Sequence, residues 1–310
     1  MNETGMWVVF AAVVIIMLFL DLGVFHRKAH AVPFKEALIW SIVWIALSLA
    51  FNLWVYWWKG SKAGLEFLTG YLIEKSLSVD NIFVFLVIFN YFHVPAAYQH
   101  RVLFWGILGA LVFRAVFIAT GIQLLQMFHW MLYVFGGFLI LTGIKMAVQH
   151  DKKIQVERNP VVRVARRLFR VTEGYRDAHF FVRQQGYLYA TPLFVVLLFV
   201  EFTDIMFAID SIPAILAVSR DPFIVYTSNV FAILGLRALY FCLAGFANLF
   251  AYLHYGLAAI LVFVGAKMML SEVYKVPVAA SLGFIALVLV VSVVASVVKP
   301  PKGTHAVLAE

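Results

Sequence analysis

Two segments of this sequence place carboxylates in the middle of strongly apolar stretches. One reads GYLIEKSLSVDNIFVF and the other reads EFTDIMFAIDSIPAI, and each has an acid six residues before an aspartate. A charge at the centre of a bilayer costs at least about 2.5–3.5 kcal/mol, so such residues face a bundle interior or a wet cavity and mark ion pathways. Several buried carboxylates cannot all stay ionised together without cations. The candidate ion-binding carboxylates are Glu74, Asp80, Asp204 and Asp210.

The sequence around these acids predicts membrane-spanning helices. The 310-residue chain is 64% hydrophobic and only 13% charged, with a mean hydropathy of +0.94. Apolar runs of about 20 residues recur along the chain, and each is long enough to cross about 30 Å of hydrocarbon as a helix. We therefore expect an all-α polytopic membrane protein with about nine transmembrane helices, near residues 6–25, 38–58, 65–90, 102–123, 129–148, 190–218, 224–246, 251–271 and 278–298.

The net charge of +8 comes from basic residues in the connections between these spans, and we do not interpret it as a nucleic-acid-binding surface. Arg and Lys gather in HRKAHAVPFK, in HVPAAYQHR, in the tail KPPK and in the segment 150–188. Because cytoplasmic loops carry the excess of Lys and Arg, we expect the N-terminus outside and the C-terminus in the cytoplasm. The start, MNETG, lacks the basic region of a cleaved signal peptide, so the first span is expected to be retained. The single cysteine, Cys242, excludes a disulfide within one chain.

The segment 150–188 is the one sizeable stretch that is not apolar. Asn159 followed by Pro160 is typical of a helix start, and VVRVARRLFR would then form a basic amphipathic helix on the anionic inner leaflet. HFFVRQQGYLYATP alternates around Gln-Gln-Gly and predicts a β-hairpin. The simpler interpretation of the whole segment is a connector and topology signal, and protein partners could also dock on it.

An internal repeat relates the two halves of the chain. EKSLSVD resembles DIMFAID, LVFRAVF resembles LGLRALY around Arg114 and Arg237, and LTGIKMAV resembles FVGAKMML around Lys145 and Lys267. Chance similarity between apolar helices is the alternative, but three matched charged positions in the same order favour a true repeat.

Each repeat holds three spans, so the second copy enters the membrane from the opposite side. Inverted repeats of this kind are typical of secondary transporters, which bind their substrates near the midplane at the repeat interface. The expected organisation is two N-terminal helices (1–64), the first repeat (65–149), the basic loop (150–189), the second repeat (190–272) and a last helix with the tail (273–310).

The inverted repeat also predicts the depth of each acid. Glu74 would lie level with Asp210. Asp80 would lie level with Asp204, with about 9 Å between the two levels for six helical residues. Glu201 precedes Asp204 by almost one turn on the same face, which predicts an inner vestibule.

Six residues of an ideal helix turn through about 600°, so the two acids of one helix point about 120° apart. Both can face one site only if the helix unwinds locally or sits at a crowded junction, and the neighbouring residues favour broken helices near the acids. The neighbouring residues that favour such breaks are Ser76, Ser78, Asn81, Ser211 and Pro213.

Two interpretations of the acids stay open. Arg114, Arg237 and Lys75 are available as counter-charges, which would make the acids part of a structural ion network. Alternatively the acids bind a cation, because they outnumber the two mid-span arginines. The neutral groups beside them are Asn and Ser oxygens, and oxygen ligands suit hard divalent cations such as Mn²⁺, Mg²⁺ or Ca²⁺ better than Zn²⁺ or Cu⁺.

Four segments, GYLIEKSLSVDNIFVF, EFTDIMFAIDSIPAI, SNVFAILGLRALYF and HFFVRQQGYLYATPL, closely resemble the TerC family of bacterial inner-membrane proteins, named for tellurium resistance. The layout is similar to that of the Alx branch, and the resemblance covers roughly residues 6–298. It implies a place in the lysine-exporter-type transporter superfamily and a role in manganese export. By motif position it implies an ion site made of Glu74, Asp80, Asn81, Asp204 and Asp210.

We therefore expect a secondary transporter and not an enzyme, which moves Mn²⁺ out of the cytoplasm in exchange for protons and needs no organic cofactor. The sequence has no G-x-x-x-x-G-K-[ST] motif for ATP. The expected accessory residues are Glu201, Ser76, Ser78 and Ser211, with Arg114, Arg237 and Lys75 as counter-charges.

Three alternatives remain. The resemblance also implies a link to loading metal into exported proteins, so the chain could be a metal-binding membrane scaffold that transports nothing. Ca²⁺ or Mg²⁺ would suit the same ligands as Mn²⁺. An intramembrane aspartyl protease is disfavoured, because it needs GxGD where this chain has SVDN and AIDS. The expected partners are a divalent ion and membrane lipid, with a second copy of the chain as a further option.

Overall fold

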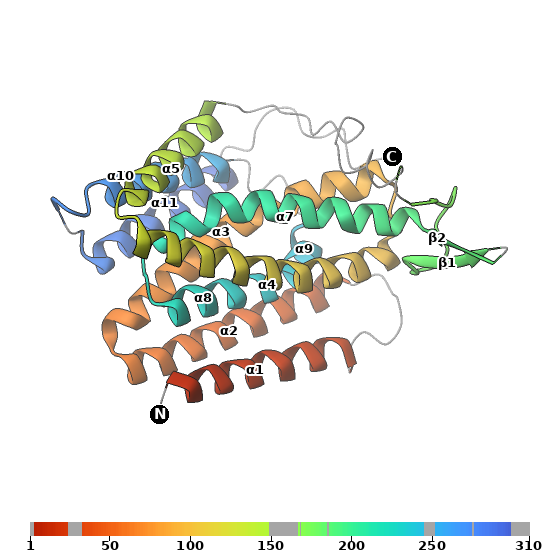
Figure 1. Cartoon of the computed structure of the whole chain (residues 1–310), viewed down its shortest axis with the longest axis horizontal. Coiled ribbons are helices and arrows are strands. Elements are labelled where there is room, and N and C mark those ends of the chain that lie inside the picture. Colours follow the sequence, from red (N-terminus) through yellow and green to blue (C-terminus); the bar gives the residue numbers. More distant parts are fainter. Residues whose placement is uncertain are drawn as a thin grey trace.

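The computed structural model describes residues 3–23, 33–148, 167, 169–184, 186–244, 252–274 and 276–298, without the side chains of residues 19–23 and 80. These residues form helices and one two-stranded sheet (Figure 1). The elements are α1 (Glu3–Gly23), α2 (Phe34–Lys59), α3 (Ser61–Tyr91), α4 (Ala96–Met127), α5 (Met131–Val148), β1 (Phe181–Gln184), β2 (Tyr187–Ala190), α7 (Pro192–Leu216), α8 (Pro222–Leu234), α9 (Leu236–Leu243), α10 (Leu253–Met269) and α11 (Val278–Val298).

The all-helical membrane architecture predicted from the sequence is confirmed. Every predicted span contains a helix, and the span predicted at 224–246 contains two, α8 and α9. Among the described residues, six segments are long and apolar enough to cross a membrane: α2, α4, α5, α7, α8 with α9, and α11. The apolar parts of α1 and α10 are shorter, and the total of nine spans stays a prediction.

The helices form a bundle with two distinct ends. Figure 1 shows α1, α2, α3, α4 and α7 running along the long axis, with the hairpin β1–β2 at one end and α5, α10 and α11 gathered toward the other. We call these the hairpin end and the α2–α3 end, after the link between those two helices. α3 packs against α2, α7, α8 and α11, and α4 packs against α7 and α8, so α3 and α8 lie inside the bundle.

The predicted hairpin is confirmed. β1 and β2 pair antiparallel with Phe181 opposite Ala190 and Gln184 opposite Tyr187. Gly186 in the turn has φ +83°, a left-handed conformation that glycine adopts without a Cβ clash. The amphipathic helix predicted at VVRVARRLFR falls largely outside the described residues.

A tyrosine ties the segment before the hairpin to the end of α3. The hydroxyl of Tyr175 donates a hydrogen bond to the carbonyl oxygen of Phe92 at 2.6 Å. Burial raises the pKa of Tyr175 to about 12, so this donor keeps its proton at physiological pH.

The predicted helix breaks at the acids are wrong. α3 is continuous through Glu74 and Asp80, and α7 is continuous through Asp204, Asp210 and Pro213. Pro213 lies in the last turn of α7, where its missing N–H removes only one hydrogen bond near the helix end.

The interruption lies instead between α8 and α9, at Gly235. Helix ends leave backbone carbonyl groups without helical partners. The ammonium group of Lys75 donates to one of these, the carbonyl oxygen of Ala232, at 3.1 Å. A cation at a helix C-terminus is also favoured by the helix dipole, so Lys75 stabilises the interruption.

Gly136 in FGGF makes a close helix contact of the kind that small residues allow in membranes. α5 makes its most extensive contact with α10, and a Cβ added at Gly136 would lie 2.9 Å from the carbonyl oxygen of Gly265. The neighbouring Gly137 has nothing within 4 Å of the same position.

These two glycines make a matched pair for mutation. Alanine improves helix propensity by about 1 kcal/mol at either position, whereas overpacking costs about 1–3 kcal/mol. We expect Gly136→Ala to lower the thermal midpoint of the purified protein and Gly137→Ala to leave it unchanged or raise it. Equal midpoints for the two variants would contradict the close α5–α10 contact.

Candidate cation site

The centre of the bundle is built around one buried arginine that bridges two carboxylates. Arg114 on α4 places Nη1 2.5 Å from Oε1 of Glu74 on α3 and Nη2 3.9 Å from Oδ1 of Asp204 on α7. All three side chains are buried. Sequence reasoning identified each of them, and the structure brings them together from three helices that are distant in sequence.

Neutral polar groups complete the arrangement. Arg114 Nη1 also donates to Oδ1 of Asn229 at 2.8 Å and to Oγ of Ser211 at 3.3 Å. The amide of Asn229 donates to Oε2 of Glu74 at 3.2 Å, and the hydroxyl of Ser78 donates to Oε1 of Glu74 at 3.4 Å. We call Glu74, Arg114, Asp204, Ser211 and Asn229 the central cluster.

Asn229 is the residue that sequence reasoning missed. It lies on α8, and its side chain is fully buried. An asparagine inside the apolar run SNVFAIL is a signal of the same kind as the acids, because a buried amide needs partners.

The central cluster carries an excess of negative charge. Two carboxylates face one guanidinium, and within the described residues Oδ2 of Asp204 is buried without a hydrogen-bond partner. A cavity of about 10 Å³, lined by Asp204 and Arg237 among others, lies beside it and has room for about one water-sized species. Apart from Asp204 and Arg237 the lining of this cavity is apolar, and the unpartnered oxygen of Asp204 favours a compensating proton, water or cation.

The single guanidinium of Arg114 compensates the charge of only one of the two carboxylates. Among the described side chains, no group of three or more His, Cys, Asp or Glu is placed to hold a metal ion. In the structure, Glu74 and Asp204 have Arg114 as their shared ionic partner.

The structure differs from the predicted levels of the acids. Glu74 shares Arg114 with Asp204, whereas Asp210 is half-buried on another face of α7 and accepts a 3.4 Å hydrogen bond from Thr142 on α5. The predicted pair of Asp80 and Asp204 falls outside the description, because the side chain of Asp80 is not described.

The remaining predicted residues surround the central cluster in different ways. Asn81 is buried on α3. The hydroxyl of Ser76 turns back to the carbonyl of Leu72 on its own helix, at 2.5 Å. Glu201 lies against Gly109, where any Cβ would come within 2.2 Å of its carboxylate, and its Oε2 has no hydrogen-bond partner among the described residues.

Arg237 and Lys75, the other two predicted counter-charges, have polar partners of other kinds. Arg237 lies 2.8 Å from Nε2 of His100, while Lys75 binds the α8 carbonyl described above. Arg114 forms a direct ion pair with Glu74 of the central cluster.

Comparison with known proteins places these helices in one family. The profile of the integral membrane protein TerC family matches residues 59–303, which include α3, α4, α7 and α8. The chain belongs to the TerC family. The whole central cluster therefore lies inside the region that matches this family.

Relatives within the TerC family align over nearly the full chain. The membrane protein STKORF319 of Myxococcus xanthus is 57% identical over 96% of this chain and 93% of its own length. Alx of Escherichia coli K12, which is named as a proposed membrane-bound redox modulator, is 52% identical over 94% of this chain and 95% of its own. A membrane protein of Rickettsia bellii is 42% identical over 94% and 97%. No solved structure matches the chain.

Proposed function

We propose that this TerC-family protein is a secondary transporter that exports a divalent cation, Mn²⁺ in particular, across the bacterial inner membrane. The observation that carries the proposal is the central cluster, where two buried carboxylates share one arginine and one carboxylate oxygen has no hydrogen-bond partner. A buried site with surplus negative charge and oxygen ligands suits a hard divalent cation.

The proposed cycle exchanges the guanidinium of Arg114 for the cation. Without an ion, Arg114 holds Glu74 and Asp204 together. A doubly charged ion neutralises both carboxylates fully and can also use Oδ1 of Asn229, so it competes with Arg114 for the same oxygens. When the ion leaves, Arg114 or protons compensate the charge again, which allows exchange of cation for protons.

The α5–α10 contact supports the inverted repeat that alternating access needs. Gly136 faces Gly265, and Gly143 faces Ala258. A shift of 122 residues, the separation of the two repeat lysines, relates Gly136 to Ala258 and Gly143 to Gly265. The two contacts therefore exchange with each other, as a two-fold pseudosymmetry requires.

The packing of whole helices supports the same relation. If α3, α4 and α5 correspond to α7, the α8–α9 pair and α10, the contact of α3 with α8 corresponds to that of α7 with α4. Both are among the most extensive helix contacts in the bundle.

The charge distribution supports an orientation with the hairpin end in the cytoplasm. Arg170, Arg176 and Arg183 lie in the segment that contains the hairpin. Because cytoplasmic connections carry the excess of Arg and Lys, this orientation puts the N-terminus outside. Export then runs from the hairpin end to the α2–α3 end.

The name of the Alx relatives suggests a different activity, membrane-bound redox modulation. A disulfide within one chain needs two cysteines, and this chain has only Cys242. The central cluster consists of carboxylate, amide, hydroxyl and guanidinium groups, which bind cations and protons. These observations favour transport, with a metal-binding scaffold as the second candidate, since it would use the same ligands.

The test is ⁵⁴Mn²⁺ flux in proteoliposomes with an imposed pH gradient. We expect flux from the wild type and none from Asp204→Asn, because the variant keeps the shape of the side chain and loses its charge. Asp177→Asn is the matched control, since Asp177 is exposed and its φ of +47° suits asparagine. Mn²⁺ binding without flux in the wild type would support the scaffold, and equal flux from Asp204→Asn would contradict the proposed site.

A further inference from the structure

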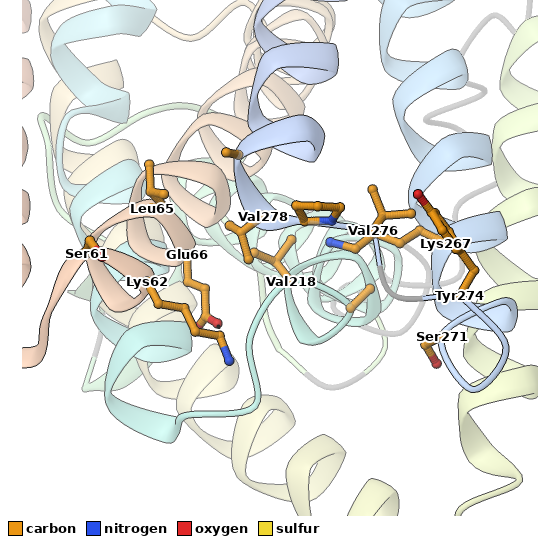
Figure 2. Close-up of a pocket in the computed structure, with 13 residues that line it drawn as sticks. Ser61, Lys62, Leu65, Glu66, Val218, Lys267, Ser271, Tyr274, Val276 and Val278 are labelled. Carbon is orange, nitrogen blue, oxygen red and sulfur yellow. Dashed lines mark ion pairs between the residues drawn. The ribbon is translucent and has the colours of Figure 1, made fainter.

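A large cavity opens at the α2–α3 end, away from the central cluster. It measures about 540 Å³ and is lined by α3, α10, the start of α11 and the link between α7 and α8. An adjoining cavity of about 280 Å³ shares Lys62, Glu66 and Ser271 with it and adds Ser219 and Arg220. Figure 2 shows Lys62 and Glu66 on one wall and Lys267, Ser271 and Tyr274 on the other.

This cavity has room for a hydrated ion, whereas the central cavity does not. A divalent ion with six waters fills roughly 200 Å³, at about 30 Å³ for each water. The 540 Å³ cavity at the α2–α3 end, which we call the outer cavity, exceeds this volume. The space beside Asp204 is about 10 Å³. An ion that passes between the two must lose or regain its water on the way.

Glu66 is the carboxylate of the outer cavity. Its side chain is 12% exposed, it accepts a 2.6 Å hydrogen bond from Ser219, and it lies 3.8 Å from the ammonium of Lys62. Lys267 on the opposite wall also interacts with its charge. One carboxylate among Lys62, Lys267 and Arg220 binds a divalent cation weakly, because the cations repel it.

A line of small and polar groups joins Glu66 to the central cluster. Glu66, Gly70 and Glu74 are spaced four residues apart on α3 and so lie along one face of the helix, about 12 Å from first to last. On the side of α8, Ser228 faces Gly70 and Asn229 binds Glu74. Each acid on this face of α3 therefore has a polar neighbour from the α7–α8 region.

The narrowest point of this line is at Gly70. A Cβ added there would lie 2.9 Å from Oγ of Ser228 and 3.5 Å from Cγ2 of Ile215. Gly70 has no side chain, so α8 approaches the backbone of α3 closely here. A small movement of α8 would widen or narrow the space between the two helices at this point.

We propose that the outer cavity is the release chamber of the transported cation, with Glu66 as its last carboxylate ligand and the Gly70–Ser228 contact as the constriction behind it. The proposal rests on the transport function proposed above. The ion leaves the central cluster along the α3–α8 interface, regains its water in the cavity, and is released quickly because the surrounding lysines weaken its binding to Glu66.

The test compares three variants in the same proteoliposome assay of ⁵⁴Mn²⁺ flux. We expect Glu66→Gln and Gly70→Ala to slow flux about tenfold, with Mn²⁺ affinity at the central cluster within twofold of wild type. Gly283→Ala is the control, because Gly283 on α11 has nothing within 4 Å of its Cβ position. The melting temperature of each variant shows whether slow flux comes from misfolding.

Thiol labelling gives a second readout that does not depend on those variants. Cys242 is the only native cysteine, so Cys242→Ser gives a background for Ser271→Cys. We expect a membrane-impermeant thiol reagent to modify Ser271→Cys from the side opposite the hairpin and to slow flux.

The outcomes separate the two proposals. Wild-type flux together with normal rates in Glu66→Gln and Gly70→Ala would overturn the release chamber and leave the transport function standing. Wild-type flux with no labelling of Ser271→Cys from that side would also overturn it. Absence of wild-type flux would overturn the transport function and the release chamber with it.

Discussion

Replacing Glu74 with glutamine is expected to weaken Mn²⁺ binding at the central cluster and to destabilise the protein at the same time. The carboxylate of Glu74 is fully buried, lies 2.5 Å from Arg114, and accepts hydrogen bonds from Asn229 and Ser78. Glutamine keeps the shape but leaves the guanidinium with Asp204, at 3.9 Å, as its remaining acid in the cluster.

The size of both effects follows from the burial of the pair. Removal of one partner from a buried ion pair costs about 3–5 kcal/mol, because the other charge stays buried without its partner. Loss of one of two carboxylate ligands should weaken Mn²⁺ binding about 100-fold, which corresponds to about 2.8 kcal/mol. If the cluster is a structural ion network, Glu74→Gln lowers only the stability of the protein. If the cluster binds a cation, the same variant also lowers the affinity for Mn²⁺.

Two measurements distinguish these interpretations. The thermal midpoint in detergent reports the loss of the ion pair, and equilibrium Mn²⁺ binding reports the loss of the ligand. Glu173→Gln is the matched control, because Glu173 is exposed on the segment before the hairpin. If the midpoint falls and Mn²⁺ affinity stays within twofold of wild type, Glu74 is part of a structural ion network only.

The helices themselves could be predicted from the sequence because each apolar run is long enough to form one. The predicted breaks were wrong because the spacing of two acids does not determine which faces of a helix meet other helices. Asp204 and Asp210 point in different directions from a continuous α7, and the two faces have different partners, Arg114 and Thr142. The interruption at Gly235 gave no comparable signal, because a single glycine in an apolar run is common in membrane helices.

Predicting which acids pair requires the packing of the helices as well as the internal repeat. Depth alone predicts Glu74 beside Asp210, but Glu74 shares an arginine with Asp204, its counterpart in the predicted repeat. Equivalent residues of two repeats meet when they lie near the pseudosymmetry axis, and α3 and α7 are in contact with each other. The spacing of residues along the chain does not determine how far each residue lies from that axis.

Replacing Arg114 with glutamine is expected to have the opposite effect on Mn²⁺ binding. The wild-type guanidinium occupies the carboxylate oxygens that the proposed cation would need, through contacts of 2.5 Å with Glu74 and 3.9 Å with Asp204. Without it, two buried carboxylates face each other unneutralised, so the ion-free protein should lose about 3–5 kcal/mol of stability. A divalent cation supplies the missing charge, and its affinity should rise at least tenfold.

This prediction can be read as a thermal shift. A ligand at 100 times its dissociation constant stabilises the folded state by about 2.7 kcal/mol. We therefore expect Mn²⁺ to raise the midpoint of Arg114→Gln more than that of the wild type at one fixed Mn²⁺ concentration, while ⁵⁴Mn²⁺ flux is lost because no internal cation helps to displace the ion. Arg176→Gln, an exposed arginine in the segment before the hairpin, is the matched control.

The double variant Glu74→Gln/Arg114→Gln completes a mutant cycle. Because the two side chains are in direct contact, the double variant should be less destabilised than the sum of the single variants. It should also lose the enhanced Mn²⁺ binding of Arg114→Gln, since one carboxylate is gone. If Arg114→Gln binds Mn²⁺ more weakly than the wild type, the arginine supports the ion instead of competing with it, and the exchange of guanidinium for cation is wrong.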